Sequence, residues 1–348
     1  MKKFFLFFLV LILSVVIFFY CSSETINQIN KENAHYKILN ESEILPIKLL
    51  GEIAERNSEI SGLCWFGSKL ILLPQYPNNF KGSAGKIFYI EKNRLDNYIN
   101  GNDTSPILPE YFEIDLSAIK DFFQLGSGFE AITIIDNTAY FTIESLNNGK
   151  TETLLVKGII DTLNNSIGLD ENSIVKDPAD LFIHNISDES ILNYQNNIFP
   201  IYEIFGKNIN KKPQVSVFDN NLKFLQKIDF PNIEYRITDV TSVDDSDKFW
   251  AINYFYPGDN KKLNPAKDEL FEKYGIGKSH QYLNPVERLV EFKILDKKID
   301  FSEKSPIYLK LLPNDSRNWE GIARFENKGF LLTTDTFPET ILAFVKTN

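Results

Sequence analysis

Acidic residues recur at one position of a repeated pattern along this chain of 348 residues. In each copy a carboxylate begins a short apolar stretch with small residues, a turn follows, and a second apolar stretch comes after the turn. The carboxylates are Glu59, Glu130, Glu189, Asp239 and Glu320, of which Glu189 belongs to the weakest copy. Carboxylate oxygens are the ligands that a hard cation such as calcium prefers. If the copies meet at one place, the pattern predicts a calcium site built from these side chains.

Arginine is rare in the sequence, yet three of its six arginines occupy one position of the same pattern. Arg56, Arg236 and Arg317 each stand three residues before a repeat carboxylate. Three interpretations are open. The arginines and carboxylates could pair and hold neighbouring units together. Alternatively, the carboxylates bind a cation while the arginines bind an anionic substrate such as a phosphate ester. The third interpretation is a binding surface for a partner protein.

Further polar residues stand near the end of the second apolar stretch in several copies. A glutamate between apolar neighbours at a strand end indicates contact with solvent or with a ligand. The residues at this position are Glu144, Glu203, Asn253 and Asp335. We predict Glu144, which lies fourteen residues after Glu130, as a catalytic residue beside the arginines.

Other catalytic templates are weak in this sequence. The three histidines, His35, His184 and His280, do not form the two-histidine helix motif of zinc proteases. Neither the Gly-x-Ser-x-Gly elbow of serine hydrolases nor a Gly-Lys-Ser/Thr phosphate loop occurs. His280 lies in an insertion between Tyr254 and Pro285 that is rich in aromatic residues. This insertion could cover the centre of the fold, bind a partner, or pack against one edge.

The composition places the repeated residues on strands. The 29 Phe and 15 Tyr favour strands over helices, and no long stretch has helical periodicity. Short helices are predicted from Asp115 to Phe123 and from Pro265 to Tyr274. In the weak third copy we expect the second strand from Ile201 to Phe205. A third strand follows most copies, and a fourth often precedes the next carboxylate.

The two ends of the chain together complete one unit of the repeat. The last copy ends after its third strand, whereas Pro46 to Ala54 forms a spare strand before the first copy. Four-stranded radial sheets closed by pairing both chain ends form a β-propeller, which protects its strand edges. The sequence therefore predicts an all-β fold, a single β-propeller over residues 46–348 closed by an N-terminal strand. Five copies indicate five blades, although a sixth could lie in the 81-residue unit that begins at Asp239. A β-sandwich is the alternative fold.

The N-terminus has the features of an export signal. Two lysines precede an unbroken apolar run from Phe4 to Tyr20, an arrangement that sends the following chain across the cytoplasmic membrane. Cys21 comes directly after the run, so residues 1–21 resemble a bacterial lipoprotein signal in which Cys21 carries the lipid anchor. An uncleaved signal anchor and ordinary cleavage are the alternatives. Each predicts an extracytoplasmic protein, periplasmic or at the cell surface, and the polar residues 22–45 read as a flexible tether.

Charge and cysteine content limit the partners of the protein. A net charge of −10 argues against nucleic acid and anionic membrane surfaces as partners. Because Cys21 ends the leader and Cys64 is the only other cysteine, a structural disulfide is not expected and a Cys-rich zinc site is excluded. We expect a monomer that meets the membrane through its N-terminal anchor and takes a small anionic molecule as substrate.

Two copies of the pattern are similar to a known family. The segments from Gly128 to Ile132 and from Asn318 to Ala323 resemble the aromatic-Glu-Gly-apolar-Ala repeat of the "esterase-like activity of phytase" propellers. The full Glu-Gly pair occurs only in the fifth copy, at Glu320 and Gly321. The resemblance implies hydrolysis of phosphate or related esters. A looser similarity to the five-bladed calcium-activated nucleotidases implies acidic and hydroxyl groups around one calcium ion.

Two classes of function follow from these patterns. In the first, the protein is a metal-dependent hydrolase in which calcium polarises a bound ester and the three arginines stabilise the developing negative charge. In the second, it is a non-catalytic binding or scaffold lipoprotein that uses one face of the propeller.

Overall fold

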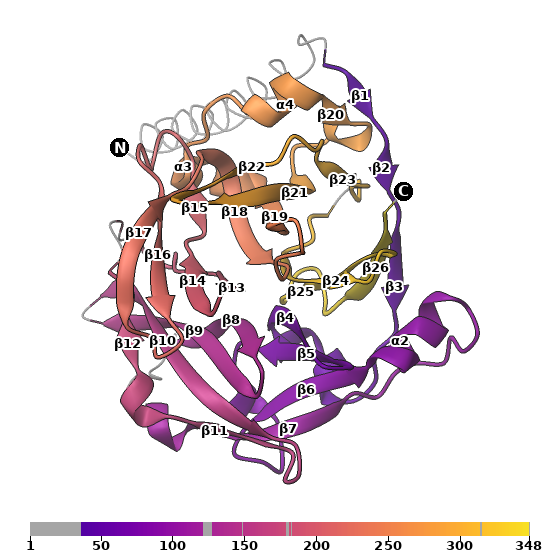
Figure 1. Ribbon diagram of the computed structural model, residues 1–348. Coiled ribbons are helices and arrows are strands. Elements are labelled where there is room, and N and C mark those ends of the chain that lie inside the picture. The colour runs from indigo at the N-terminus through magenta and orange to yellow at the C-terminus, as the bar shows by residue number, and fades with distance from the viewer. Residues whose placement is uncertain are drawn as a thin grey trace, which may run out of the picture.

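Five blades stand around a common axis in the computed structural model of the protein, which describes residues 36–120, 127–147, 149–178, 181, 183–313 and 315–347 (Figure 1). Blade 1 consists of β4 (Ile60–Phe66), β5 (Lys69–Pro74), β6 (Lys86–Glu91) and β7 (Glu110–Asp115). Blade 2 consists of β8 (Gly128–Ile135), β9 (Thr138–Asn147), β10 (Lys150–Asp161) and β11 (Ser166–Leu169), with β12 (Val175–Lys176) beside β10. Blade 3 consists of β13 (Ser190–Tyr194), β14 (Asn197–Ile201), β16 (Gln214–Asp219) and β17 (Phe224–Asp229).

The last two blades complete the circle. Blade 4 consists of β18 (Ile233–Val240), β19 (Lys248–Phe255), β21 (Val286–Leu295) and β22 (Lys298–Phe301), with β15 (Ile204–Phe205) beside β18 and β23 (Ile307–Leu309) beside β21. Blade 5 consists of β24 (Trp319–Phe325), β25 (Gly329–Thr334), β26 (Leu342–Lys346) and β3 (Ile44–Ile47). Neighbouring strands within the five blades are antiparallel, and parallel pairing joins outer strands of adjacent blades, β7 with β11 and β17 with β22.

The first strand of each blade lies innermost. β4 contacts β8, β8 contacts β13, β13 contacts β18, β18 contacts β24, and β24 contacts β4, so the five inner strands form a closed ring. This ring confirms the predicted β-propeller and shows five blades. In the described residues, the interval between Asp239 and Glu320 contains the rest of blade 4 and an insertion with two short helices, and no sixth blade.

The blades bury apolar side chains on both faces, because each blade lies between two others. In β5 every residue from Leu70 to Pro74 is buried, and in β19 every residue after Lys248 is buried. A strand that is covered on both faces reads as a continuous apolar run rather than as an alternating pattern. Each fully buried Leu, Ile or Phe contributes about 1.5–3 kcal/mol to folding, so these runs stabilise the stacking of the blades.

The N-terminal strand closes the ring as predicted, although its bounds differ. β3 pairs with β26 in antiparallel register from Ile47 opposite Leu342 to Ile44 opposite Val345, and Figure 1 shows these two strands side by side near the C-terminus. The strand was expected from Pro46 to Ala54. It ends earlier because Gly51, with a φ of 83°, turns the chain into a short 3₁₀ helix at Glu52–Ala54.

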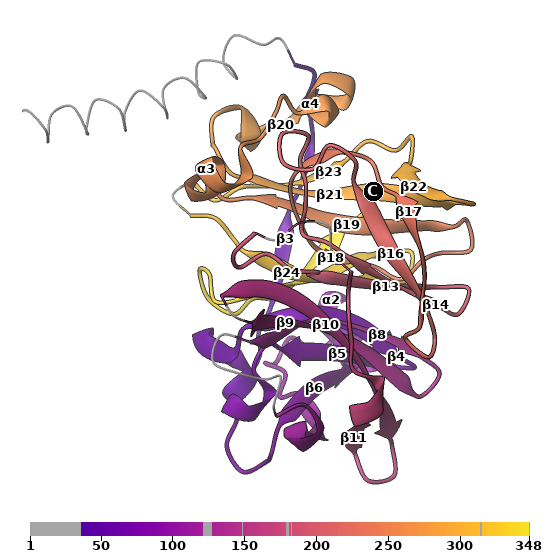
Figure 2. The same cartoon turned by 90° about the vertical axis from the view of Figure 1, so that its left-hand side faces the viewer.

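Part of the expected tether is also paired. β1 (Ile38–Leu39) pairs in parallel with β20 (Ile276–Gly277), and β2 (Glu41–Ser42) pairs in parallel with β23. Figures 1 and 2 both show β1 beside β20 and the helix α4 (Glu269–Tyr274) of the insertion. The last ten residues of the segment predicted as flexible, 36–45, therefore contribute strands to the propeller.

The helices differ in detail from the predictions. Of the segment from Asp115 to Phe123, the structure describes a 3₁₀ turn at Leu116–Ile119, and residues 121–126 lie outside the described ranges. In the insertion, α3 (Asn260–Leu263) precedes α4 (Glu269–Tyr274), which begins after the capping residue Asp268 rather than at Pro265. The helix α2 (Lys92–Ile99) was not predicted. In the third copy the second strand is β14, four residues before the expected start.

The remaining short elements are 3₁₀ turns. They lie at Arg56–Ser58, Pro77–Asn79, Glu171–Ser173, Pro257–Asp259 and Ser279–Gln281. No helix in the described ranges is both long and apolar enough to cross a membrane. The predicted leader, the predicted lipid-anchor residue Cys21, His35 and the first part of the predicted tether lie outside the described residues.

Candidate functional site

Four of the five inner strands carry a β-bulge at the same position. The register shifts between Ile60 and Gly62 in β4, between Phe129 and Ala131 in β8, between Ile237 and Val240 in β18, and between Trp319 and Gly321 in β24. A bulge turns one side chain away from the regular alternation of the strand. The side chains set free in this way are Ser61, Glu130, Thr238 with Asp239, and Glu320.

The bulges correct the alignment of the repeat. The Ser61 hydroxyl donates to the Phe129 carbonyl of the next blade at 2.8 Å, and the Thr238 hydroxyl donates in the same way to the Trp319 carbonyl. Ser61 and Thr238 are therefore the counterparts of Glu130 and Glu320. Glu59 lies two residues before the bulge with a left-handed φ of 47°, and its carboxyl occupies a different place.

Asp239 has a different environment from the other repeat carboxylates. Its buried carboxylate accepts hydrogen bonds from the backbone N–H of Ile322 at 2.7 Å, of Leu63 at 3.4 Å and of Val240 at 2.8 Å. Burial raises the pKa of Asp239, and these three bonds oppose that rise. Because the donors belong to β24, β4 and β18, the carboxylate ties together the inner strands of three blades.

The carboxyl groups of Glu130, Glu189 and Glu320 gather at the centre. Burial raises the pKa of all three well above the usual range, and repulsion from neighbouring carboxylates, Glu144 and Glu203 among them, adds to this. The carboxyls of Glu130 and Glu189 are within hydrogen-bond contact of each other. Glu130 is buried, whereas Glu189 and Glu320 are half-buried. Closely spaced carboxyls repel one another when they ionise, so this cluster favours protonated carboxyls more than an isolated glutamate does.

Glu144 and Glu203 adjoin this cluster in contrasting environments. Burial and the neighbouring Glu203 raise the pKa of Glu144 to about 7. Glu203 is 1% exposed and forms an ion pair with Arg236, while its Oε2 atom has no hydrogen-bond partner in the described part of the chain. Burial raises the pKa of Glu203, and Arg236 opposes that rise. Of the two, Glu203 is the carboxyl with a cation in direct contact, which favours its ionised form.

Two of the predicted arginines pair with carboxylates of other segments. Arg236 contacts Glu203 and donates from Nε and Nη2 to Asp259 at 3.1 and 2.9 Å. Arg317 donates from Nε and Nη2 to Glu287 at 2.9 and 2.8 Å. Glu203 follows β14 of blade 3, and Glu287 belongs to β21 of blade 4. Each arginine therefore links its own blade to the preceding one, although its partner is not a repeat carboxylate.

Arg56 joins blade 1 to blade 5 through a backbone carbonyl and an aromatic ring. Its Nε donates to the Thr336 carbonyl at 3.0 Å, and its guanidinium lies 4.9 Å from the ring centre of Phe337. Phe337 is 56% exposed. Burial raises the pKa of the half-buried Glu59, and Asp335, directly after β25, adds to the rise. Arg56 and Glu59 of blade 1 and Asp335 of blade 5 thus lie together where these two blades meet.

Three residues of the site were not predicted. Gln75 donates from Nε2 to Glu130 at 2.9 Å, and Asn318 donates from Nδ2 to both Glu320 and Asp335. Burial and the surrounding carboxylates raise the pKa of Tyr76 to about 12. Gln75 directly follows β5, as Asp335 follows β25, so the end of the second strand was the signal available in the sequence.

The remaining groups lie at the border of this cluster or apart from it. The insertion of blade 4 places Lys262 of α3 close enough to Glu203 and Glu144 to interact with them electrostatically. Asn253 is buried and donates to the carbonyls of Glu234 and Arg236. In the described ranges, no group of three or more His, Cys, Asp or Glu side chains is arranged to hold a metal ion. Calcium binding by the repeat carboxylates stays a prediction.

Comparisons with known proteins found similar solved structures, but no relative by sequence. No family model matches the sequence, and no curated protein matches it. A glycoside hydrolase candidate from Bacteroides ovatus ATCC 8483 has 11% identity and a TM-score of 0.49, covering 88% of this chain and 96% of that chain. An exo-1,5-α-L-arabinanase from a bovine ruminal metagenomic library has 9% identity and a TM-score of 0.43, covering 86% and 96%. A glucose dehydrogenase candidate from Thermus thermophilus has 9% identity and a TM-score of 0.43, covering 85% and 98%.

These similarities assign no activity to the chain. The resemblance to the "esterase-like activity of phytase" family rests on the segments around Glu130 and Glu320 alone, because no family model matches.

Proposed function

We propose that the protein is a hydrolase whose carboxyl groups at the centre of the propeller cleave a bond by acid–base catalysis. The observation that carries this proposal is the contrast between Glu144 and Glu203. Burial and Glu203 raise the pKa of Glu144 to about 7, whereas Glu203 contacts the half-buried Arg236. Two adjacent carboxyls in contrasting environments supply the acid and the base that hydrolysis of a neutral substrate requires.

Each side chain has a defined task in this mechanism. Glu144 donates its proton to the leaving-group oxygen. Glu203, held by Arg236 and with its free Oε2 atom, accepts a proton from water or attacks the substrate directly. Glu130, Glu189 and Glu320 surround this pair, and an ionised carboxylate among them stabilises a positively charged, oxocarbenium-like transition state.

The charge at the centre favours a neutral, hydroxyl-rich substrate such as a glycoside. Carboxyls outnumber the cations Arg236 and Lys262 there, and an anionic phosphate would be repelled. Arg236 and Arg317 already bind carboxylates. The hydrolysis of phosphate or related esters therefore needs an added cation such as calcium, and it forms the competing version of the proposal. In either version the protein acts outside the cytoplasm, tethered to the membrane by its N-terminus.

A substrate screen with matched variants tests the proposal. The full-length protein in detergent micelles is assayed on 4-nitrophenyl glycosides of neutral pentoses and hexoses and on 4-nitrophenyl phosphate, with calcium and with chelator. Glu144→Gln should reduce kcat by about 10²–10⁴-fold, the usual contribution of a general acid. Glu113→Gln, on the exposed side of β7, is the control and should retain activity.

The outcomes separate the alternatives. Glycoside turnover that Glu144→Gln abolishes supports the proposal. Phosphate-ester turnover that depends on calcium, together with a calcium-induced rise in melting temperature, supports the competing version. No turnover on either substrate class, with or without calcium, would favour the binding or scaffold protein.

A further inference from the structure

The chain enters the propeller through an ordered segment that we call the N-terminal strap, residues 36–47. It runs along the outside of blades 4 and 5, where β1 pairs with β20, β2 with β23, and β3 with β26 (Figure 1). The strap therefore touches the insertion, blade 4 and blade 5 in turn. Its side-chain contacts continue from this outer edge towards the central site.

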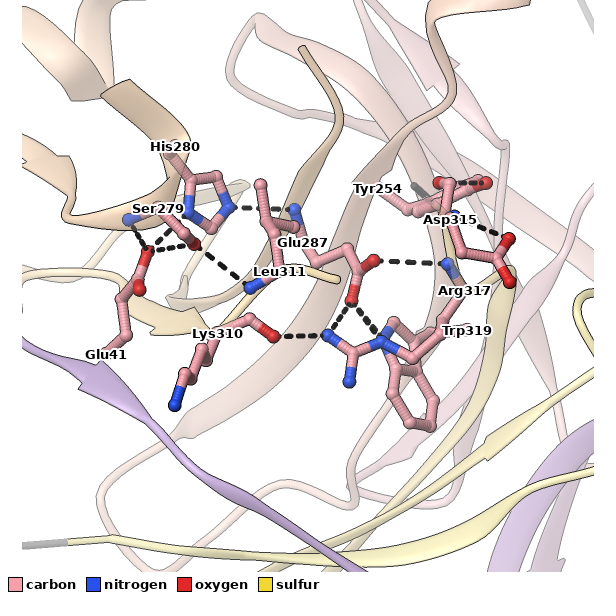
Figure 3. Close-up of polar contacts among 11 residues, drawn as sticks. Glu41, Tyr254, Ser279, His280, Glu287, Lys310, Leu311, Asp315, Arg317 and Trp319 are labelled. Atoms are coloured by element: carbon pink, nitrogen blue, oxygen red, sulfur yellow. Dashed lines mark hydrogen bonds and ion pairs between the residues drawn. The ribbon is translucent and has the colours of Figure 1, made fainter. Parts of the chain in front are cut away.

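The first contact is a buried carboxylate of the strap. Oε1 of Glu41 accepts from the backbone N–H of Ser279 at 2.8 Å and from its hydroxyl at 2.7 Å, and it lies 2.8 Å from Nδ1 of His280 (Figure 3). Burial opposes ionisation of Glu41, but the bonds from His280 and Ser279 outweigh it and lower the pKa of the carboxyl. Glu41 is thus an anion held in a cradle of donors on the insertion.

His280 connects Glu41 to blade 4. Its ring is fully buried, and its Nε2 accepts the backbone N–H of Glu287 at 3.2 Å. Because Nε2 accepts, the proton of a neutral ring resides on Nδ1 and is donated to Glu41. His280 therefore fixes the start of β21 relative to the strap.

Glu287 connects β21 to the segment that carries Glu320. Its carboxylate is fully buried and accepts from the backbone N–H of Arg317 at 3.1 Å, from Nε and Nη2 of Arg317, and from the indole N–H of Trp319 at 2.7 Å (Figure 3). Trp319 is itself fully buried and directly precedes the bulge at Glu320. Glu287 thus holds the backbone of Arg317 and the side chains of Arg317 and Trp319 in place, directly before the bulge.

We propose that the N-terminal strap positions Glu320 through a relay of Glu41, His280, Glu287, Arg317 and Trp319. These are positioning residues, because none of them belongs to the cluster of central carboxyls. The place of Glu320 in catalysis rests on the proposed function, whereas the relay itself does not. The strap, which follows the predicted tether, would then determine the position of a side chain in the central site.

The relay is tested by following the Glu320 carboxyl directly. The full-length protein in micelles is labelled with [5-¹³C]glutamate, and the Glu320 signal is identified as the one that Glu320→Gln removes. Its titration with pH is then recorded in Glu41→Ala and His280→Ala. Leu270→Ala, a buried position on α4 outside the relay, is the control for loss of stability.

We expect the Glu320 resonance and its titration midpoint to move in Glu41→Ala and His280→Ala and to stay in place in Leu270→Ala. Glu41→Gln keeps an acceptor oxygen for Ser279 and His280 and should restore most of the wild-type behaviour. An unchanged Glu320 signal in Glu41→Ala overturns the inference, even if His280→Ala fails to fold.

Turnover adds an independent measurement. With a substrate found in the screen, Glu41→Ala should lower kcat by about 10-fold or more while KM changes little, as expected for a misplaced catalytic group. A moved Glu320 signal with unchanged kcat would mean that the strap does not position the catalytic machinery. Absence of any turnover would defeat the proposed function but leave the titration as the test of the relay.

Discussion

The closing seam between β3 and β26 permits a quantitative test of the ring. Ile47 and Leu342 are register partners from opposite ends of the chain, and both are buried in one apolar cluster, with exposures of 3% and 1%. Ile47→Ala should destabilise the protein by about 3 kcal/mol, and Leu342→Ala by about as much, because each leaves a cavity in a packed interface. Leu45, on the same strand, is 44% exposed, so Leu45→Ala should cost less than about 1 kcal/mol.

A double-mutant cycle measures the seam itself. Residues in contact show a coupling free energy of about 0.5–3 kcal/mol, whereas distant sites add within about 0.5 kcal/mol. Urea unfolding of the wild type, the two single variants and Ile47→Ala/Leu342→Ala gives this coupling. Ile47→Ala combined with Val217→Ala, in β16 of blade 3, is the distant control. A coupling between Ile47 and Leu342 no larger than that control would refute closure of the ring by β3.

Three further predictions concern the centre and the anchor. The pKa of Glu144 is raised from 4.5 to about 7, so the contribution of this group to the free energy of unfolding is fully present below pH ~4.5. That contribution should fall by at most about 3 kcal/mol as the pH rises through 7. In urea unfolding, Glu144→Gln should reduce this dependence of the free energy of unfolding on pH. Asp239→Asn should lower the free energy of unfolding by about 2–4 kcal/mol, since one acceptor oxygen of a buried network is lost. The same variant should leave any calcium-induced rise in melting temperature unchanged; loss of that rise would make Asp239 a calcium ligand. Cys21→Ala should abolish acyl labelling, and protease added to spheroplasts should degrade the propeller; a protected propeller would contradict the extracytoplasmic location.

The architecture was predictable because it is encoded locally and repeatedly. Short apolar runs separated by turns recur in each blade, and the spare strand near Pro46 had to pair with the incomplete last unit. The bounds were less predictable, because pairing decides where a strand ends. β3 stops at Ile47 once β26 has no further partner residue to offer, and Gly51 then turns the chain.

The candidate site was only partly visible in the sequence, for a different reason. Glu130 and Glu320 stood out as carboxylates within apolar strands, and they do meet at the centre. A bulge adds one residue to a strand and leaves no recognisable pattern in the sequence. The repeat was therefore aligned on Glu59 instead of Ser61 in the first copy, and on Asp239 instead of Thr238 in the fourth. The partners of the arginines, Glu203 and Glu287, lie on other blades, and no local pattern reveals a contact of that kind.

The order of the N-terminal strap could not be predicted from the sequence for a third reason. Its first two strands have two residues each, which is too short for any periodicity, and Glu41 sits in a polar segment that reads as a linker. The groups that hold this segment in place lie far away in the sequence. They are the hydrogen-bond donors of Ser279 and His280 and the strand edges of β20 and β23. Order that depends on distant partners is invisible until the fold brings those partners together.

The protons of the central carboxyls connect stability with function. A buried group of like-charged carboxylates would destabilise the propeller if all of them ionised, and Arg236 and Lys262 are too few to neutralise them. The protein therefore keeps some of these groups protonated at neutral pH or binds a cation. A group that must retain a proton in order to fold is also one that can donate it to a bound substrate. This coupling makes the pH dependence of unfolding and that of turnover two measurements of the same protons, and Glu144→Gln should alter both.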